Sequence, residues 1–412
     1  MPKVNRRTLL KGSAPMLFSL SSIGRALVTP SNKTTKLAVV GRGLVGSAAA
    51  RHLSKMGHEV VLVGPDEPKD YVHHNGVFAS HYDEGRITRS FDAQEFWRDA
   101  NRASISRYGE IASESGVDFY HEAGVLHIGP SGSNGVAQVK EVCDQAGIPI
   151  EAFHDEELAK RFPFLKSTAG MQGYFESHNA GYISARRLVR AQTAAAQHFG
   201  ARIMAEPALE ISETSSGIVV RTKSGNIEAD RVLVAAGGYT QSLLGQSLGL
   251  TAYQRTVALF RLNPAEAHRL AGMPSMRCIE TKDHDPYLLP PMPYPDGQIW
   301  IKIGANRVNV PLKNAAEINA WFKSGGSIEI ADWVQQLMLE RIKDLKFEER
   351  RVLPCMTTYG ETGLPQIGPV SKRVSVVSGC YGKSAKCSDE LGRLGAMAML
   401  GEVRAELAPK VG

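Results

Sequence analysis

Apolar and polar stretches alternate along the chain and predict strands and helices in turn. Residues 36–40 form an apolar run with the length of a buried strand, and residues 47–56 follow with the spacing of a helix that Gly57 ends. A second apolar run covers residues 59–63. This order of strand, helix and strand predicts an α/β fold built on a parallel sheet.

The same alternation returns in the middle of the chain. Residues 185–199 have helical spacing, a strand begins near residue 200, and residues 217–222 and 226–230 predict a hairpin. Residues 231–239 are predicted to form a buried strand that ends in a pair of glycines.

The turn between the first strand and the first helix carries three glycines in the pattern G-x-G-x-x-G. Gly41 permits the tight turn, Gly43 lets the backbone approach a pyrophosphate, and Gly46 allows close packing of the helix. The helix N-terminus then faces the phosphates. Because the motif lies between a predicted strand and a predicted helix, we interpret it as a dinucleotide-binding turn.

Two further features bear on the nucleotide. An acid that hydrogen-bonds the ribose is expected about 20 residues after the glycines, where Gly64 stands, and Asp66 or Glu67 just beyond could reach the ribose instead. Gly237 and Gly238, interpreted as a second glycine turn, favour an FAD fold, in which the chain leaves and re-enters the nucleotide domain. An ordinary turn is the alternative.

The composition is that of a globular protein. Of 412 residues, 43% are hydrophobic and 22% charged, which excludes collagen-like, coiled-coil and wholly disordered classes and leaves length for two domains. The five cysteines form no disulfide framework and show no zinc-type spacing, so no metal is expected. Six of the 48 basic residues lie in residues 1–33, which hold no acid. The remainder balances 42 basic against 42 acidic residues, so nucleic acid is not an expected partner.

A leader is predicted at the amino terminus. Arg6 and Arg7 precede a weakly apolar run over residues 12–28, which indicates a twin-arginine signal over residues 1–33, with a basic tail as the alternative. The run is interrupted by Arg25 and too short to span a bilayer, so no permanent anchor is expected. We therefore expect the twin-arginine machinery as a partner. Because this route exports folded, cofactor-bearing proteins, we also expect a redox enzyme that works in the periplasm or is secreted.

Five later segments resemble a known family. They are residues 80–89, 300–304, 354–357, 365–369 and 379–386. The first, SHYDEGRITR, keeps the length, the serine and both arginines of the family segment S-x-H-G-D-T-R-x-x-R, with Tyr82 for the histidine and Glu84 for the aspartate. With the glycine motif, these segments resemble the FAD-dependent amine oxidases of the D-amino acid oxidase superfamily, typified by monomeric sarcosine oxidase and N-methyltryptophan oxidase. The resemblance runs from about residue 36 to about residue 407.

The resemblance implies a fold as well as a cofactor. The expected fold class is α/β, with a Rossmann-like FAD-binding domain and an inserted α+β substrate domain on a mixed sheet. The FAD-binding domain would be assembled from residues 34–86, 182–247 and 354–412, and the substrate domain from residues 87–181 and 248–353.

Three residues would act on the cofactor. Cys355 matches the cysteine that binds the flavin 8α-methyl group through sulfur, so FAD is expected to be covalent; the alternative is an inert thiol, as expected of Cys143 and Cys278. Lys302 matches a lysine above the flavin ring, whose charge favours the reduction of oxygen, although a lysine on a solvated edge strand is also common. Arg86 matches an arginine close to the ring.

Other residues would form the substrate side. Arg89 and Lys386 match a pair that holds the substrate carboxylate, and Tyr287 resembles a substrate-side tyrosine. Asn306 stands where sarcosine oxidase has a histidine, and Thr357 where it has a tyrosine. Both changes alter the pocket wall, so sarcosine itself is not implied.

The implied activity is oxidation of a secondary amine or amino acid that carries a carboxylate. Hydride transfer to the flavin gives an imine, and oxygen is reduced to hydrogen peroxide. Two alternatives keep the fold and FAD: a dehydrogenase that passes electrons to a quinone or carrier, and a tailoring oxidoreductase in a biosynthetic cluster. Replacing Lys302 by Met separates oxidase from dehydrogenase. A disulfide between Cys380 and Cys387 is a further hypothesis for an exported protein.

Overall fold

The strand that precedes the glycine motif lies in the middle of a six-stranded sheet. In sheet order the strands are β20 (Gln366–Pro369), β21 (Val374–Ser378), β13 (Arg231–Val234), β1 (Lys36–Val40), β2 (Glu59–Val63) and β9 (Arg202–Met204). All neighbours are parallel except β20 and β21. Buried Val and Leu side chains run almost without interruption along β1, β2 and β13, because parallel sheets are covered on both faces.

The computed structural model describes residues 35–279, 286–305 and 307–409. The predicted leader over residues 1–33 and the predicted pocket residue Asn306 lie outside the described residues.

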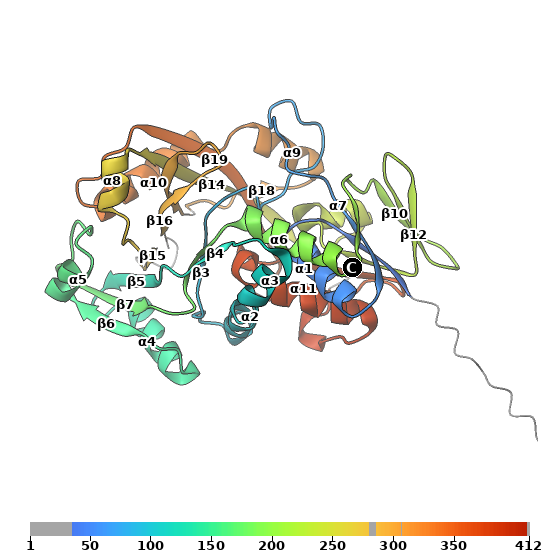
Figure 1. The fold of residues 1–412 in the computed structure, drawn as a ribbon, viewed down its shortest axis with the longest axis horizontal. Helices are drawn as coiled ribbons and strands as arrows, with labels where there is room; N and C mark the ends of the chain where they lie inside the picture. Colours follow the sequence, from blue (N-terminus) through green and yellow to red (C-terminus); the bar gives the residue numbers. More distant parts are fainter. Residues whose placement is uncertain (1–34, 280–285, 306, 410–412) are drawn as a thin grey trace, which may run out of the picture. The chain divides into compact units, whose positions relative to one another are not determined.

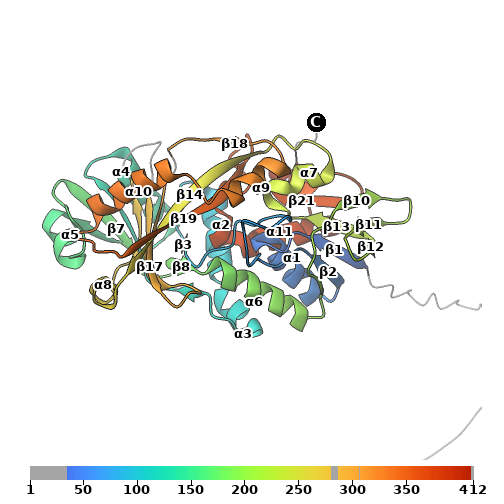
Figure 2. The ribbon, with the colours of Figure 1, turned by 90° about the horizontal axis from the view of Figure 1, so that it is seen from above.

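Five helices lie together beside the six-stranded sheet. They are α1 (Leu44–Lys55), α2 (Glu95–Ile105), α3 (Tyr108–Ser115), α6 (Ala185–His198) and α11 (Ser384–Leu400). Figures 1 and 2 show α1 between α6 and α11, in agreement with the contacts of the chain. The packing of α11 on α1 is close, because a Cβ at Gly392 would lie 2.6 Å from the Ala49 nitrogen.

A buried carboxylate joins these helices. Asp389 of α11 is fully buried and accepts hydrogen bonds from Arg51, Arg107 and Gln192 at 3.3, 2.5 and 2.9 Å. His52 lies 3.0 Å from the same carboxylate. Burial alone would raise the pKa of Asp389, but the His52 and Arg107 side chains lower it by more than burial raises it, so the pKa lies below its usual value. Asp389 therefore stays charged and ties α11 to α1 and α6.

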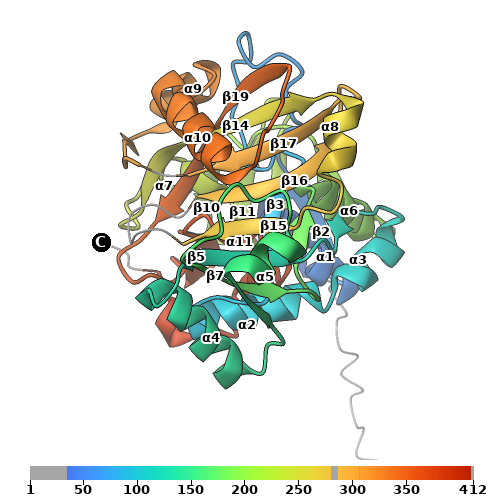
Figure 3. The same ribbon diagram turned by 90° about the vertical axis from the view of Figure 1, so that its left-hand side faces the viewer.

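A second, nine-stranded sheet is mixed, as the family resemblance implies. In sheet order its strands are β18 (Pro311–Leu312), β14 (Thr251–Leu262), β17 (Ile299–Gly304), β16 (Tyr287–Pro293), β15 (Ser275–Cys278), β5 (Val125–Pro130), β7 (Met171–Glu176) and β6 (Glu151–His154), and β19 (Glu349–Tyr359) also pairs with β14. Figure 3 shows them in this order from β19 to β7. Only β5 and β15 pair in parallel.

Five further helices and two small sheets belong to the described fold. Helices α4 (Asn134–Ala146), α5 (Asp155–Arg161), α8 (Pro264–Arg269), α9 (Ala315–Lys323) and α10 (Ile328–Arg341) accompany the nine-stranded sheet, with α10 packed on β14 and β17. Two three-stranded sheets consist of β10 (Glu210–Glu213), β11 (Ile218–Arg221) and β12 (Asn226–Ala229), and of β3 (Arg86–Thr88), β8 (Gly181–Ile183) and β4 (Tyr120–His121).

Most predicted elements are confirmed, and one is wrong at its end. The predicted hairpin forms β11 and β12, and the first predicted helix begins earlier, at Leu44. The strand predicted over residues 231–239 stops at Val234 instead, and a 3-10 turn at Gly237–Tyr239 leads into α7 (Thr240–Leu244). The chain has left the extended region by Ala236, with φ of −85° and ψ of 14°, and Gly237 follows with a φ of +56°.

The strands of the six-stranded sheet all come from the three stretches assigned to FAD binding, and those of the nine-stranded sheet come from the two insertions, except for the end of β19. The domain boundaries themselves stay a prediction. Among the described residues, we find no helix that combines the length and the apolar character needed to cross a membrane.

Candidate active site

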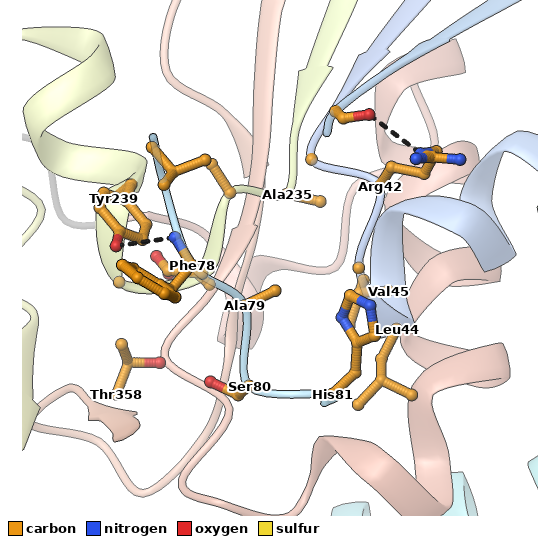
Figure 4. A pocket seen from close by; sticks show the side chains of 18 of the residues that line it. Arg42, Leu44, Val45, Phe78, Ala79, Ser80, His81, Ala235, Tyr239 and Thr358 are labelled. Carbon is orange, nitrogen blue, oxygen red and sulfur yellow. Dashed lines mark hydrogen bonds between the residues drawn. The ribbon is translucent and has the colours of Figure 1, made fainter. Parts of the chain in front are cut away.

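A cavity of about 340 Å³ opens where the carboxyl ends of β1 and β13 meet the start of α1. Gly41, Gly43, Gly237 and Gly238 line it, so the structure brings the two predicted glycine turns together. Figure 4 shows the backbone of Arg42 and Ala235 facing the wall formed by residues 78–81. This is the edge of an α/β sheet at which nucleotides bind.

The glycines shape this cavity in different ways. A Cβ at Gly41 would lie 2.3 Å from the Ala235 carbonyl oxygen, and a Cβ at Gly46 would lie 1.8 Å from that of Gly41. No side chain fits at either position. A Cβ at Gly43 would meet only His81 within 4 Å, at 3.8 Å, so its missing side chain leaves the helix N-terminus open toward the cavity.

Arg42 lies between the glycines and takes part in the cavity wall. Its Nε donates to the Gly64 carbonyl at 2.9 Å, as Figure 4 shows, and its guanidinium pairs with Asp66. Asp66 is mostly exposed and lines an adjoining cavity of about 580 Å³ with Glu67. Arg186 holds Glu67 at 2.6 and 2.7 Å. A ribose contact for Asp66 therefore stays a prediction.

His81 completes this wall as a neutral ring. Burial, followed by the nearby charges of Arg186 and Arg42, lowers its pKa to about 3. The other end of the wall formed by residues 78–81 is fixed by Tyr239, whose hydroxyl accepts a hydrogen bond from the Phe78 N–H at 3.1 Å (Figure 4).

A smaller cavity of about 230 Å³, which we call the second cavity, shares Ser80 and Tyr82 with the 340 Å³ cavity at the glycine turns. Its walls include Arg86 and Cys355, two of the predicted cofactor-facing residues. Cys355 lies on β19, and its half-buried sulfur is 3.7 Å from Arg86 Nη2. Its backbone carbonyl accepts a hydrogen bond from Trp321 at 2.8 Å, which holds the strand in place.

Lys302 is completely buried at this place, so the alternative of a solvated edge strand is excluded. Its Nζ donates to Asp83 at 2.5 Å and to the Gly85 carbonyl at 2.6 Å. Burial, followed by the nearby charge of Arg86, lowers the pKa of Lys302. The Asp83 carboxylate, in an ion pair with the same amine, opposes this shift and favours the charged form. Tyr287 lies beside it, with the ring centroid 5.6 Å from Nζ.

Arg89 and Lys386 come together in a separate cluster. Lys386 is 5% exposed, and burial together with the adjacent Arg89 charge lowers its pKa to about 7. Asp92 belongs to the same cluster and accepts a hydrogen bond from Lys383 at 2.8 Å. Burial raises the pKa of Asp92, but the charges of Lys383, Arg89 and Lys386 bring it below its usual value. Ser384, two residues before Lys386, lines the first cavity.

The structure also corrects one cysteine assignment. Cys380 and Cys387 are separate thiols, so the disulfide proposed between them is not formed. Burial raises the pKa of both to about 12, as it does for Cys143. Cys143 and Cys278 are buried, as predicted. Among the described residues, no group of three His, Cys, Asp or Glu side chains is placed to hold a metal ion.

The residues present fit an FAD. The two glycine turns leave backbone exposed at a helix N-terminus, and the first cavity adjoins a second that contains the Cys355 sulfur.

A comparison with protein families decides the family. Residues 36–397 match the model of the DAO family, described as FAD dependent oxidoreductase. The chain belongs to this family. Its members similar to this chain include monomeric sarcosine oxidase of Bacillus sp. (strain B-0618), 24% identical over 90% of this chain and 93% of that protein. N-methyl-L-tryptophan oxidase of Yersinia pestis (strain Pestoides F) is 26% identical over 50% of this chain and 55% of that protein.

Solved structures of DAO-family type show the same fold. NikD, an unusual amino acid oxidase essential for nikkomycin biosynthesis, matches in its open form with a TM-score of 0.73 and 20% identity, over 92% of this chain and 98% of that one. Glycine oxidase from Geobacillus kaustophilus matches with a TM-score of 0.69 and 19% identity, over 90% of this chain and 96% of that one. This DAO-family chain is therefore an FAD-dependent oxidoreductase with the expected α/β fold.

Sequence reasoning missed three residues of the site. Asp83 and Tyr294 bind one another at 2.7 Å beside Lys302, and Arg42 lines the FAD cavity. Asp83 occupies the glycine position of the family segment S-x-H-G-D-T-R-x-x-R, and this replacement of glycine by an acid was the sequence signal that could have identified it. Tyr294 lies in a loop after β16 and had none.

Proposed function

We propose that this protein oxidises the carbon–nitrogen bond of a small secondary amine or amino acid that carries a carboxylate. The pair Arg89 and Lys386 carries the proposal. Both are cationic groups of one cluster, and the charge of Arg89 opposes the charging of the buried Lys386 amine. A carboxylate bound between them would relieve this repulsion, and a guanidinium and an ammonium suit it in geometry and charge.

The protein's part in the reaction is to bind and orient the amine. Arg89 and Lys386 fix its carboxylate, and Ser384 places this cluster beside the FAD cavity. Bound FAD would supply the two-electron oxidation of the amine to an imine, which water then hydrolyses. The names of the related sarcosine, N-methyl-L-tryptophan and glycine oxidases support this substrate class.

Substrate kinetics of one variant test the carboxylate site. Lys386→Met should raise the KM for a carboxylate-bearing amine at least tenfold, because an interaction between charged groups is lost. The KM for the same amine without its carboxylate should change less than twofold. An equal rise for both amines would contradict the assignment.

For the cofactor, we propose attachment through Cys355. Its half-buried sulfur lines the second cavity beside Arg86, which suits a residue that bonds a group placed there. Cys380, also half-buried, lines the FAD cavity too, but desolvation of its thiol raises its pKa to about 12, which disfavours the reactive thiolate.

Two electron acceptors are candidates, and the surroundings of Lys302 bear on both. Oxygen, giving hydrogen peroxide, is one, because a charged amine at Lys302 would stabilise negative charge on oxygen. Asp83 at 2.5 Å favours that charged form, although burial lowers the pKa of Lys302. An organic acceptor such as a quinone is the second, favoured by the carboxylate 2.5 Å from the same amine. If oxygen is the natural acceptor, replacing Lys302 by Met should abolish oxygen consumption and spare dye reduction. If it is not, the substitution should not separate the two activities in this way.

For location, we propose export to the periplasm by the twin-arginine route. The support is the pair Arg6 and Arg7 ahead of an apolar run. Replacing both arginines by lysine should retain the protein in the cytoplasm of an expressing bacterium. Unchanged recovery in the periplasmic fraction would contradict the proposal.

A further inference from the structure

Asp83 brings a negative charge to a position where the family segment has glycine. The side chain is 2% exposed. Lys302 donates to it at 2.5 Å, the Tyr294 hydroxyl donates to it at 2.7 Å, and Arg86 forms an ion pair with it. One donor from its own segment, Arg86, and two from the distant residues Tyr294 and Lys302 thus fix the carboxylate in one orientation.

The Asp83 carboxylate reduces the positive charge and the free hydrogen-bond donors that Lys302 offers to a neighbouring molecule. Two of the three ammonium protons are used, one by Asp83 and one by the Gly85 carbonyl. A lone fixed cation stabilises negative charge that develops on a nearby oxygen. Lys302 and Arg86 share the Asp83 carboxylate, so the three groups carry one net positive charge where the two cations alone would carry two, and the positive potential at a nearby oxygen is weaker.

Asp83 and Lys302 also lie close to the proposed flavin site, where a change in charge affects the reaction with oxygen. Asp83 lines the 230 Å³ cavity together with Arg86 and Cys355. That cavity adjoins the FAD cavity through Ser80 and Tyr82. The carboxylate therefore lies beside the sulfur proposed to hold the flavin.

We propose that Asp83 restrains Lys302 from activating oxygen, so that electrons taken from the amine pass to a quinone-class acceptor in preference to O₂. The inference rests on the proposed function and names its electron acceptor. In the net reaction the amine loses one hydride from carbon and one proton from nitrogen and gains a C=N bond. The quinone gains the two electrons and two protons and becomes a hydroquinone, and no oxygen is consumed.

The first test measures oxidation of the chemically reduced holoenzyme. Dithionite replaces the amine as reductant, and the enzyme is mixed with air-saturated buffer or with a water-soluble benzoquinone in a stopped-flow instrument. The wild type should react faster with the quinone. Asp83→Asn, which removes the charge at nearly constant volume, should react with oxygen at least tenfold faster than the wild type. In the double variant Asp83→Asn/Lys302→Met this gain should disappear.

Two outcomes would overturn the proposal: an unchanged or slower oxygen reaction in Asp83→Asn, or a wild type that reacts with oxygen as fast as with the quinone. Asp144→Asn is the matched control, because it removes a carboxylate from an exposed pair with Lys140. Asp83→Gly serves as the second variant if Asp83→Asn fails to fold. Since dithionite supplies the electrons, failure of the proposed amine substrates would leave this result intact.

Thermal unfolding of the same holoenzymes supplies a readout that does not depend on turnover. Lys302→Met should lower the unfolding temperature, because the buried Asp83 loses its ammonium partner. Adding Asp83→Asn should recover part of that loss. Strict additivity of the two substitutions would show that the residues are not coupled and would contradict the proposal.

Discussion

Lys386 offers a prediction in which function and stability change in opposite directions. The amine is 5% exposed, and its pKa falls from 10.5 to about 7 through burial and the charge of Arg89. In the unfolded chain the amine keeps its ordinary pKa, so between about pH 7 and pH 10.5 the unfolded state binds more protons than the folded state. Lys386 therefore destabilises the fold most at neutral pH and below, and the destabilisation disappears as the pH approaches 10.5.

The magnitude follows from the same values. At about 1.4 kcal/mol per pH unit, a fall from 10.5 to about 7 corresponds to about 5 kcal/mol in the free energy of unfolding. Lys386→Met removes this destabilisation and keeps the apolar stem. We therefore expect the variant to be more stable than the wild type at pH 7 by about 2 kcal/mol or more, a part of that upper figure.

Urea unfolding midpoints at pH 7, 8.5 and 10 provide the assay. The difference between Lys386→Met and the wild type should be largest at pH 7 and narrow toward pH 10. Lys383→Met is the matched control on the same segment, because Lys383 pairs with Asp92 at 2.8 Å and its loss should lower the midpoint. A Lys386→Met variant less stable than the wild type at pH 7 would refute the reasoning.

Three more predictions concern the cofactor and the fold. Acid precipitation should leave the yellow colour in the pellet for the wild type and for Cys380→Ser, but release it to the supernatant for Cys355→Ser; colour in the supernatant of the wild type would exclude a covalent bond. Gly43→Ala should fold but bind FAD at least tenfold more weakly, because its methyl group enters the space at the helix N-terminus, whereas Gly109→Ala, where nothing lies within 4 Å, should bind normally in a cofactor titration. Asp389→Asn should lower the free energy of unfolding by about 3–5 kcal/mol, since it leaves Arg51, His52 and Arg107 around a neutral group, and a loss below about 1 kcal/mol in urea unfolding would show that the cluster is not coupled.

Much of the FAD-binding half could be predicted because its signals are local. A buried strand, three glycines and a helix follow one another within about 20 residues, and each has a direct physical reason. The end of the strand that begins at residue 231 was predicted wrongly because the chain turns at Ala236 and Gly237, inside an apolar run that does not reveal the turn. Family resemblance placed Cys355, Arg86 and Lys302, and the structure brings all three to one place.

The charge environment of the site could not be predicted in the same way. Asp83 and Lys302 are 219 residues apart in sequence, and Arg42 meets Asp66 only after β1 and β2 have paired. The neutral state of His81 depends on burial by several elements. Such properties arise from tertiary packing, so a motif gives the residue type but not the charge that acts on it.

The most direct test of the proposed function is anaerobic bleaching of the yellow holoenzyme by amines. N-methyl amino acids and simple amino acids are added without oxygen, each beside the same amine lacking its carboxylate, and the visible absorbance of the bound cofactor is followed. We predict that carboxylate-bearing amines bleach the cofactor and that their counterparts do so only at tenfold or higher concentration. Bleaching by dithionite but by none of these amines, or equal bleaching with and without the carboxylate, would contradict the account.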